Sequence, residues 1–107
     1  MSNKYAKYSK TQKHTPFLPE ATLDYHDRGT LSTYDIEREL NIFLEDSYNH
    51  DLSQLLIITG KGHNSPQGPI VRPFVGQLLK KHYLVAKYKQ ADDSRGGAGA
   101  FEVTLIE

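Results

Sequence analysis

A run of four apolar residues, LLII at 55–58, is followed at once by a loop rich in glycine and proline and then by a helical pattern. The loop, TGKGHNSPQGP at 59–69, holds three glycines and two prolines. An apolar run bounded by turn residues is typical of a strand that is buried on both faces or central in a sheet. A strand that leads through a loop into a helix indicates a layered α/β domain, with residues 55–58 at its centre.

Periodic patterns on either side of this run complete the order of elements. We expect strands at residues 21–26, 55–59, 84–89 and 100–106, and helices at about 33–48 and 70–81. Ser32 or Thr33 is expected to cap the first helix. Its apolar residues share one face: Ile36, Leu40, Phe43 and Leu44.

The resulting order, βαβαββ, makes the strands joined by each crossover parallel and the last two strands antiparallel. Two helices can cover one face of the sheet. The predicted fold class is therefore α/β, as an α+β two-layer sandwich. It has a four-stranded mixed sheet, two helices on one face, and a second face that is partly open. In the last strand we expect Phe101, Val103 and Leu105 on one face, and Glu102 and Thr104 on the other.

Length and composition exclude several classes of protein. The chain of 107 residues is long enough for one domain with a modest core. It has no cysteine, which excludes a disulfide framework, a thiolate nucleophile and a cysteine-based zinc site. No apolar run approaches the ~20 residues of a membrane helix, and the N-terminus lacks a signal-peptide core. We expect a soluble, cytoplasmic, monomeric protein with no membrane contact.

The net charge of zero conceals strong segregation along the chain. Residues 1–20 carry four lysines against one glutamate, without an apolar period. We expect residues 1–16 to form a flexible basic arm and residues 17–107 to form the domain. Residues 21–60 carry eight acids against two arginines, whereas residues 61–91 carry six cations and no acid. The acid-free stretch is a candidate surface for phosphate, although any single surface lysine is more often simply solvated.

Three separated segments should meet at the carboxyl ends of the parallel strands, where ligands of such sheets bind. They are LDYH at 23–26, TGKG at 59–62 and RGGAGA at 95–100. Asp24 and His26 are two residues apart on a strand, so we expect them on the same face. A carboxylate beside an imidazole can orient it, raise its basicity or hold a metal. The alternative is an aspartate that caps a turn and a histidine at the rim.

The glycines of the TGKG loop would let backbone amides approach an anion closely, near the start of the second helix. Lys61 adds a cation, and Arg72 could reach a phosphate from the first helical turn. His63 could join this site or be exposed to solvent. The loop lacks the GxxxxGK[ST] pattern of a Walker A motif. The alternative is a βα loop that binds nothing.

Together these segments resemble the Smr (small MutS-related) domain over residues 17–107. The resemblance rests on LDYH, LLIITGKG, GPIVRPFVGQLL and GGAGAFEVTLIE, in this order, and the lead-in PFLPEATLDYH is similar to stand-alone members. It implies a fold like the C-terminal domain of translation initiation factor three. It also implies nucleic-acid binding and, in many members, endonuclease activity. The substrates it implies are branched DNA and messenger RNA on stalled ribosomes, so nucleic acid and the ribosome are the expected partners.

The family's LDxH motif falls on Leu23, Asp24 and His26, which assigns Asp24 and His26 as catalytic residues. Its glycine motifs also match Gly99 and Ala100. The residues expected to bind nucleic acid are Thr59, Gly60, Lys61, Gly62, His63, Arg72, Arg95, Gly96 and Gly97. Two positions depart from the usual pattern. Asp27 replaces a glycine, and Thr59 replaces a histidine, which removes any acid–base role of that histidine.

Two functions remain open at this point, since a third, a protein-interaction domain that uses the open sheet face, would leave the charge segregation and the convergent motifs unexplained. The first is an endonuclease, with RNA favoured over DNA, in which His26 is the general base for a 2′-hydroxyl or a water. A divalent cation such as magnesium could serve it, but Asp24 and Asp27 alone make a sparse site, so no metal ligands are assigned. The alternative is a non-catalytic module that binds nucleic acid or the ribosome. The Asp24–His26 pair favours catalysis, because a phosphate site has no need of a carboxylate.

Overall fold

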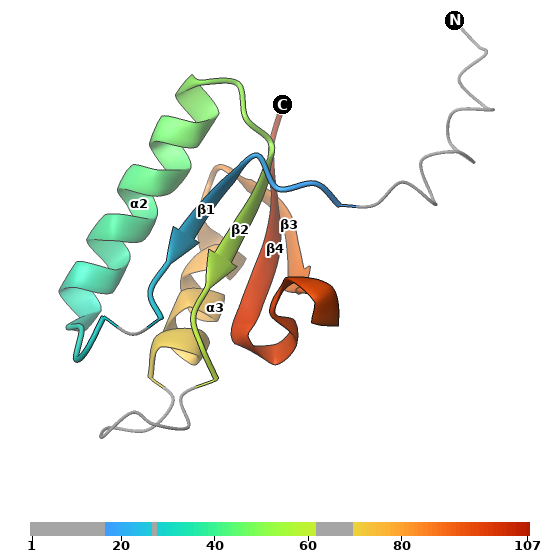
Figure 1. Ribbon diagram of the computed structural model, residues 1–107. Coiled ribbons are helices and arrows are strands. Elements are labelled where there is room, and N and C mark those ends of the chain that lie inside the picture. Colours follow the sequence, from blue (N-terminus) through green and yellow to red (C-terminus); the bar gives the residue numbers. More distant parts are fainter. Residues whose placement is uncertain (1–16, 27, 62–69) are drawn as a thin grey trace, which may run out of the picture.

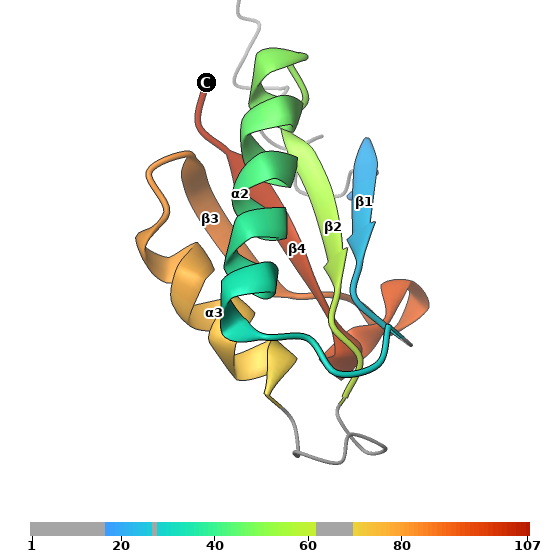
Figure 2. The ribbon, with the colours of Figure 1, turned by 90° about the vertical axis from the view of Figure 1, so that its left-hand side faces the viewer.

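The central strands of the sheet lie between an edge strand on each side, and both helices pack on the same face (Figure 1, Figure 2). The computed structural model describes residues 17–26, 28–61 and 70–107; the predicted basic arm, residues 1–16, lies outside them. The helices are α2 (Thr33–Asn49) and α3 (Val71–Lys81). The strands are β1 (Ala21–Asp24), β2 (Gln54–Ile58), β3 (Val85–Gln90) and β4 (Ala100–Leu105).

The strand order is β1-β2-β4-β3. Strands β1 and β2 pair in parallel, and β4 is antiparallel to both β2 and β3. Strands β2 and β3 therefore run in the same direction with β4 between them. The predicted βαβαββ order, the mixed sheet and the one-sided helix layer are confirmed. None of the helices in these described ranges has the length and apolar character needed to cross a membrane.

Helix α2 begins at the cap that the sequence predicts. Ser32 is the N-cap, and its hydroxyl accepts a hydrogen bond from the Asp35 N–H at 3.0 Å. This bond satisfies one of the free N–H groups of the first turn. The buried stripe of α2 consists of Ile36, Leu40, Leu44 and Ser47.

The core lies between the helices and the sheet. Leu55 and Ile57 of β2 are fully buried within it, whereas Leu56 packs on the opposite face of the sheet with Ala91 and Ala100. Strand β2 is therefore buried on both faces, as its unbroken apolar run predicts. The other large side chains that are fully buried in the described part of the chain are Ile36, Leu40, Leu44, Val75, Leu79, Val103 and Leu105.

The face of the sheet away from the helices is more covered than the sequence suggested. Glu102 points to that face, as predicted, but it is only 3% exposed. Between β3 and β4 the chain forms two 3₁₀ turns, η1 (Asp93–Arg95) and η2 (Gly97–Gly99), in place of a plain loop. The carboxylate of Glu102 accepts hydrogen bonds from the Asp92 N–H and from Arg95 Nε, both at 3.0 Å. These bonds hold the turns over the sheet and replace the water that Glu102 has lost.

Strand β1 ends at Asp24, two residues earlier than predicted. The next residue, Tyr25, turns into the core, where it is 3% exposed. Its hydroxyl donates a 2.8 Å hydrogen bond to the carbonyl oxygen of Ile36, in the first turn of α2. Tyr25 therefore ties the end of β1 to the start of α2. Burial raises the pKa of Tyr25 above its usual range, because the phenolate would lose its hydration.

We expect Tyr25→Phe to lower the free energy of unfolding at pH 7 by about 1 kcal/mol, because it removes one buried hydrogen bond. The raised pKa adds a pH effect: the unfolded chain ionises Tyr25 near pH ~10, while the folded chain keeps it protonated. This contribution to stability is complete below pH ~10 and declines as the pH rises further. Urea unfolding between pH 7 and 11 measures both effects.

The matched control for this variant is Tyr34→Phe, because Tyr34 is 72% exposed. We expect no change in stability at pH 7 from Tyr34→Phe, and no change in the alkaline slope. If both variants had the same slope as the wild type, burial of the Tyr25 hydroxyl would not be the source of the alkaline effect.

Candidate functional site

The imidazole of His26 lies directly over Gly60, at the carboxyl ends of β1 and β2. Asp24 Oδ1 accepts a hydrogen bond from the His26 N–H at 2.7 Å and so closes the turn that follows β1. A Cβ atom on Gly60 would lie only 3.1 Å from His26 Cδ2, and Gly60 has φ +74°. Glycine is required here both for the backbone conformation and for the close approach of the ring. Asp24 therefore caps the turn after β1, and its hydrogen bond sets the position of the His26 backbone.

The glycine-rich segment before β4 is joined to the end of β2 through the carbonyl group of Gly99. The Gly99 oxygen accepts the N–H groups of Thr59 and Gly60, at 2.8 and 3.0 Å. The Thr59 hydroxyl adds hydrogen bonds to the carbonyl oxygens of Gly60 and Gly99, at 2.9 and 3.2 Å. We expected the amides of this loop to be available for a phosphate. For Thr59 and Gly60 the structure corrects that expectation, because both amides donate within the protein.

Among the described residues, Lys61 and Arg72 lie beside the junction of Gly60 and Gly99. Arg28, which follows β1, is instead paired with Glu39 at 2.7 Å. Lys61 is exposed, and its Cγ lies 3.6 Å from where a Cβ on Gly99 would stand. Arg72 donates to the Ala100 carbonyl oxygen at 3.3 Å and stacks over the Phe101 ring, 4.2 Å from its centroid. Burial lowers the pKa of Arg72, although a guanidinium remains charged at neutral pH. Arg72 therefore supplies a fixed positive charge, and Lys61 supplies a more exposed one.

Arg95 is not part of this cluster. Its guanidinium binds the buried Glu102 and also Asp92, whose Oδ2 lies 2.8 Å from an Arg95 terminal nitrogen. A guanidinium held by two carboxylates has little charge left to offer a phosphate. The neighbouring Gly96 and Gly97 have φ +117° and +51°, and they let the chain turn back toward Gly99. Their part in the site is to shape this turn.

Three candidate residues, Gly62, His63 and Asp27, lie outside the described residues. Within residues 17–26, 28–61 and 70–107, no group of three or more histidine, cysteine, aspartate or glutamate side chains is arranged to hold a metal ion. Among the described residues, this edge presents the His26 imidazole, the turn-capping Asp24 carboxylate, and the side chains of Lys61 and Arg72. This set suits proton transfer beside a bound anion.

Comparison with known proteins identifies the class. The model of the Smr domain matches residues 26–106. A curated relative, an uncharacterized protein of Treponema pallidum (strain Nichols), is 28% identical over 88 residues; these cover 82% of this chain and 42% of the relative. The chain thus spans less than half the length of that protein.

Two solved structures share the fold. The Smr domain of Thermus thermophilus MutS2 superposes with a TM-score of 0.66 at 23% identity, covering 84% of this chain and all of that one. YdaL, a stand-alone small MutS-related protein from Escherichia coli, superposes with a TM-score of 0.72 at 23% identity, covering 99% of this chain and 79% of that one. The protein belongs to the Smr domain family.

Several residues that build the site were not predicted from the sequence. The Gly99 carbonyl and the Glu102 carboxylate both act through their position between β2, β4 and the η turns. The only sequence signal for Gly99 was its place in a glycine-rich motif, and Glu102 looked like an ordinary solvent-facing residue of an alternating strand. Gln90, which accepts from Arg72 at 3.5 Å, gave no signal at all.

We expect Gly60→Ala to displace the His26 ring, because the new methyl group would meet it at 3.1 Å. The left-handed backbone adds a cost of about 1–2 kcal/mol in unfolding free energy. The matched control is Gly29→Ala: Gly29 also has φ +74°, but nothing lies within 4 Å of its Cβ position. Both variants should lose the stability that the backbone conformation costs, Gly60→Ala should lose somewhat more because of the contact, and only Gly60→Ala should shift the His26 ring resonances in an NMR spectrum.

We expect Arg95→Leu to lower the free energy of unfolding by up to about 3–5 kcal/mol, because it removes the hydrogen-bonded partner of the buried Glu102 and leaves only Lys89, at 3.9 Å, as a cation beside it. Replacing both residues, as Arg95→Leu/Glu102→Leu, should recover much of that loss. Urea unfolding of the three proteins measures it. A stable Arg95→Leu protein with weakened nucleic-acid binding would instead make Arg95 a ligand-binding residue.

Proposed function

We propose that this protein binds single-stranded nucleic acid at the edge formed by residues 24–26, 59–61 and 99–100, and that it cleaves a phosphodiester bond there, with RNA favoured over DNA. The observation that carries the proposal is the close packing of the His26 ring against Gly60, beside Lys61 and Gly99. A histidine fixed at a cationic loop is positioned for proton transfer at a bound phosphate.

In the proposed reaction His26 takes the proton of a 2′-hydroxyl. The freed oxygen attacks the adjacent phosphorus, and the bond from phosphorus to the 5′-oxygen breaks. The leaving 5′-oxygen takes a proton from water, and the hydroxide that forms takes the proton back from His26. The products are a 2′,3′-cyclic phosphate and a 5′-hydroxyl. Lys61 and Arg72 offset the charge that develops on the phosphate oxygens. Asp24 holds the His26 backbone through its 2.7 Å hydrogen bond.

RNA is favoured because the 2′-hydroxyl lies next to the phosphorus in the substrate itself. A nucleophile that is already in place saves the entropy of bringing in a water. DNA lacks this group and requires an activated water. A divalent cation such as magnesium could activate that water. Asp24, together with Asp27 outside the described residues, is the candidate oxygen ligand.

We expect His26→Ala to lower the cleavage rate of a labelled single-stranded RNA by at least about 100-fold, the usual contribution of a general base. A substrate with one 2′-deoxynucleotide at the cut position should resist cleavage there. The matched control is His50→Ala. His50 follows α2 at the opposite end of the sheet, where its ring bonds the Asp46 carbonyl oxygen at 2.7 Å.

Parallel reactions with magnesium and with chelator decide whether a metal takes part. Equal rates for the wild type and His26→Ala would remove His26 from the chemistry. RNA that is bound in a salt-dependent way but never cut would favour the alternative, a non-catalytic binding module. Before that conclusion, RNA on a stalled ribosome and a branched DNA have to be tried as substrates, because the presenting partner could be part of the site.

A further inference from the structure

An exposed tyrosine is held in a fixed orientation just after α3, at the opposite end of the sheet from His26. Tyr83 is 68% exposed. Its ring stacks on that of His82, with the centroids 4.9 Å apart and the planes at 17°. Its hydroxyl donates a 3.2 Å hydrogen bond to Glu45 Oε2 on α2. One face of the ring is covered, the hydroxyl is anchored, and much of the remaining surface is open to solvent.

The supporting ring of His82 is itself fixed. The Leu84 N–H donates to His82 Nδ1 at 3.1 Å, so the ring proton resides on Nε2, which donates to Asn41 Oδ1 at 3.1 Å. Burial lowers the pKa of His82, and the ring is neutral at pH 7. The structure places His82 partly buried between α2 and the start of β3. The fixed His82 ring therefore supports the Tyr83 ring from one side.

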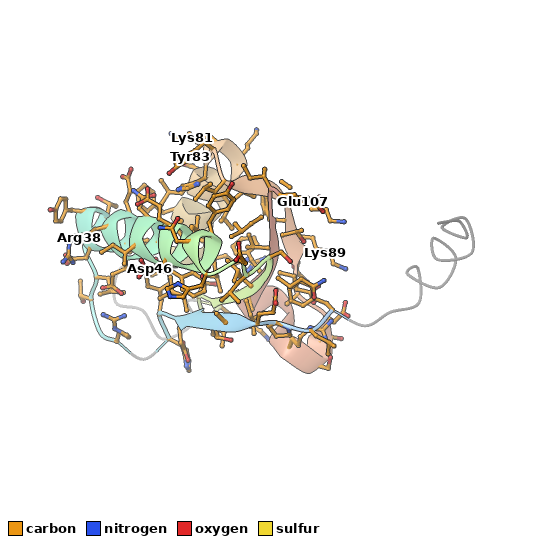
Figure 3. All side chains as sticks on the ribbon, turned by 90° about the horizontal axis from the view of Figure 1, so that it is seen from above. Arg38, Asp46, Lys81, Tyr83, Lys89 and Glu107 are labelled. Atoms are coloured by element: carbon orange, nitrogen blue, oxygen red, sulfur yellow. The ribbon has the colours of Figure 1, made fainter. Side chains whose placement is uncertain are left out.

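The charge around Tyr83 suits an anionic ligand. Lys80 and Lys81 occupy the last turn of α3, and both are exposed. Figure 3 shows Lys81 and Tyr83 next to each other at one corner of the domain. Glu45 keeps its negative charge while it accepts from the Tyr83 hydroxyl, so the two lysines face one carboxylate here. No acidic residue occurs between residues 61 and 91, so the surface of α3 from Arg72 to Lys81 contributes no carboxylate of its own.

We propose that Tyr83 is a second nucleic-acid contact, a stacking platform for an unpaired base, with Lys80 and Lys81 on the flanking phosphates. An aromatic face combined with neighbouring cations is how proteins bind single strands without sequence preference. The pre-fixed ring lowers the entropy lost on stacking. This second contact rests on the proposed function, because the strand that stacks on Tyr83 would be the same strand that is held at the His26 edge.

The distance between the two contacts has a measurable consequence. The six residues of β3 give a separation of about 20 Å along the strands, and β1 and β3 are three strand spacings apart, which adds a lateral offset of about 14 Å. The two contacts therefore lie roughly 25 Å apart, and a strand with about 3.4 Å between nucleotides needs about seven of them to cover it. A trinucleotide can therefore reach one contact only, whereas an oligonucleotide of about 12 residues can reach both.

The first test is the affinity of Tyr83→Ala for single-stranded oligouridylate of about 3 and about 12 nucleotides. We expect the 12-mer to bind about 5- to 150-fold more weakly than to wild type, the range for one lost stacking contact. Tyr83→Phe keeps the ring but loses the hydrogen bond to Glu45, so it should retain most of the affinity. The matched control is Tyr34→Ala, since Tyr34 is 72% exposed, close to the 68% of Tyr83, and should leave the affinity unchanged.

The second test uses NMR spectra of the wild type during titration with the 12-mer. We expect the 12-mer to shift the resonances of both His26 and Tyr83. A trinucleotide bound at the His26 edge should leave the Tyr83 resonances unshifted. Shifts at His26 alone, with normal affinity for Tyr83→Ala, would overturn the stacking site and leave the proposed function intact. No shift and no binding at either place would overturn both. Lys80→Gln/Lys81→Gln should reduce the slope of log affinity against log salt by about 1.4.

Discussion

The candidate site depends on a single backbone carbonyl. The Gly99 oxygen accepts two amide groups from the end of β2, and these bonds join segments that lie 40 residues apart in the sequence. The same junction sets the path of Gly60, and Gly60 sets how close the His26 ring can come. The site is thus a stack of three chain segments, in which a shift of any one would move the imidazole relative to Lys61.

A buried ion pair supports this carbonyl from the other face of the sheet. Glu102 and Arg95 hold the η turns against β4, and Gly99 is the last residue of the second turn, so the ion pair also positions Gly99. Burying a charged pair usually contributes little net stability compared with apolar residues of the same shape. What it does contribute here is a defined path for a glycine-rich segment, which has few side-chain contacts of its own to fix it.

The charges of the domain are divided between its two helices. Helix α2 carries acids along its exposed side and places Glu45 against Tyr83, whereas α3 carries none. An anionic strand is therefore favoured along α3 over α2, although Glu45 of α2 contacts Tyr83 at one end of this path. The proposed nucleic-acid path therefore runs along α3, between Lys61 and Arg72 at one end and Lys80 and Lys81 at the other.

The sequence by itself determined the order, type and approximate bounds of the elements, because hydrophobic period and capping residues are local signals. It also identified Asp24, His26, Gly60 and Lys61 as residues that meet at one sheet edge, because strand direction follows from the crossovers. Only the tertiary structure decided what each group bonds to. Arg95 was expected to meet nucleic acid but pairs with Glu102, and the Thr59 and Gly60 amides serve Gly99. Alternation along a strand fixes the face of a side chain; it does not fix the path of a loop, and these contacts form only once β2, β4 and the η turns are packed together.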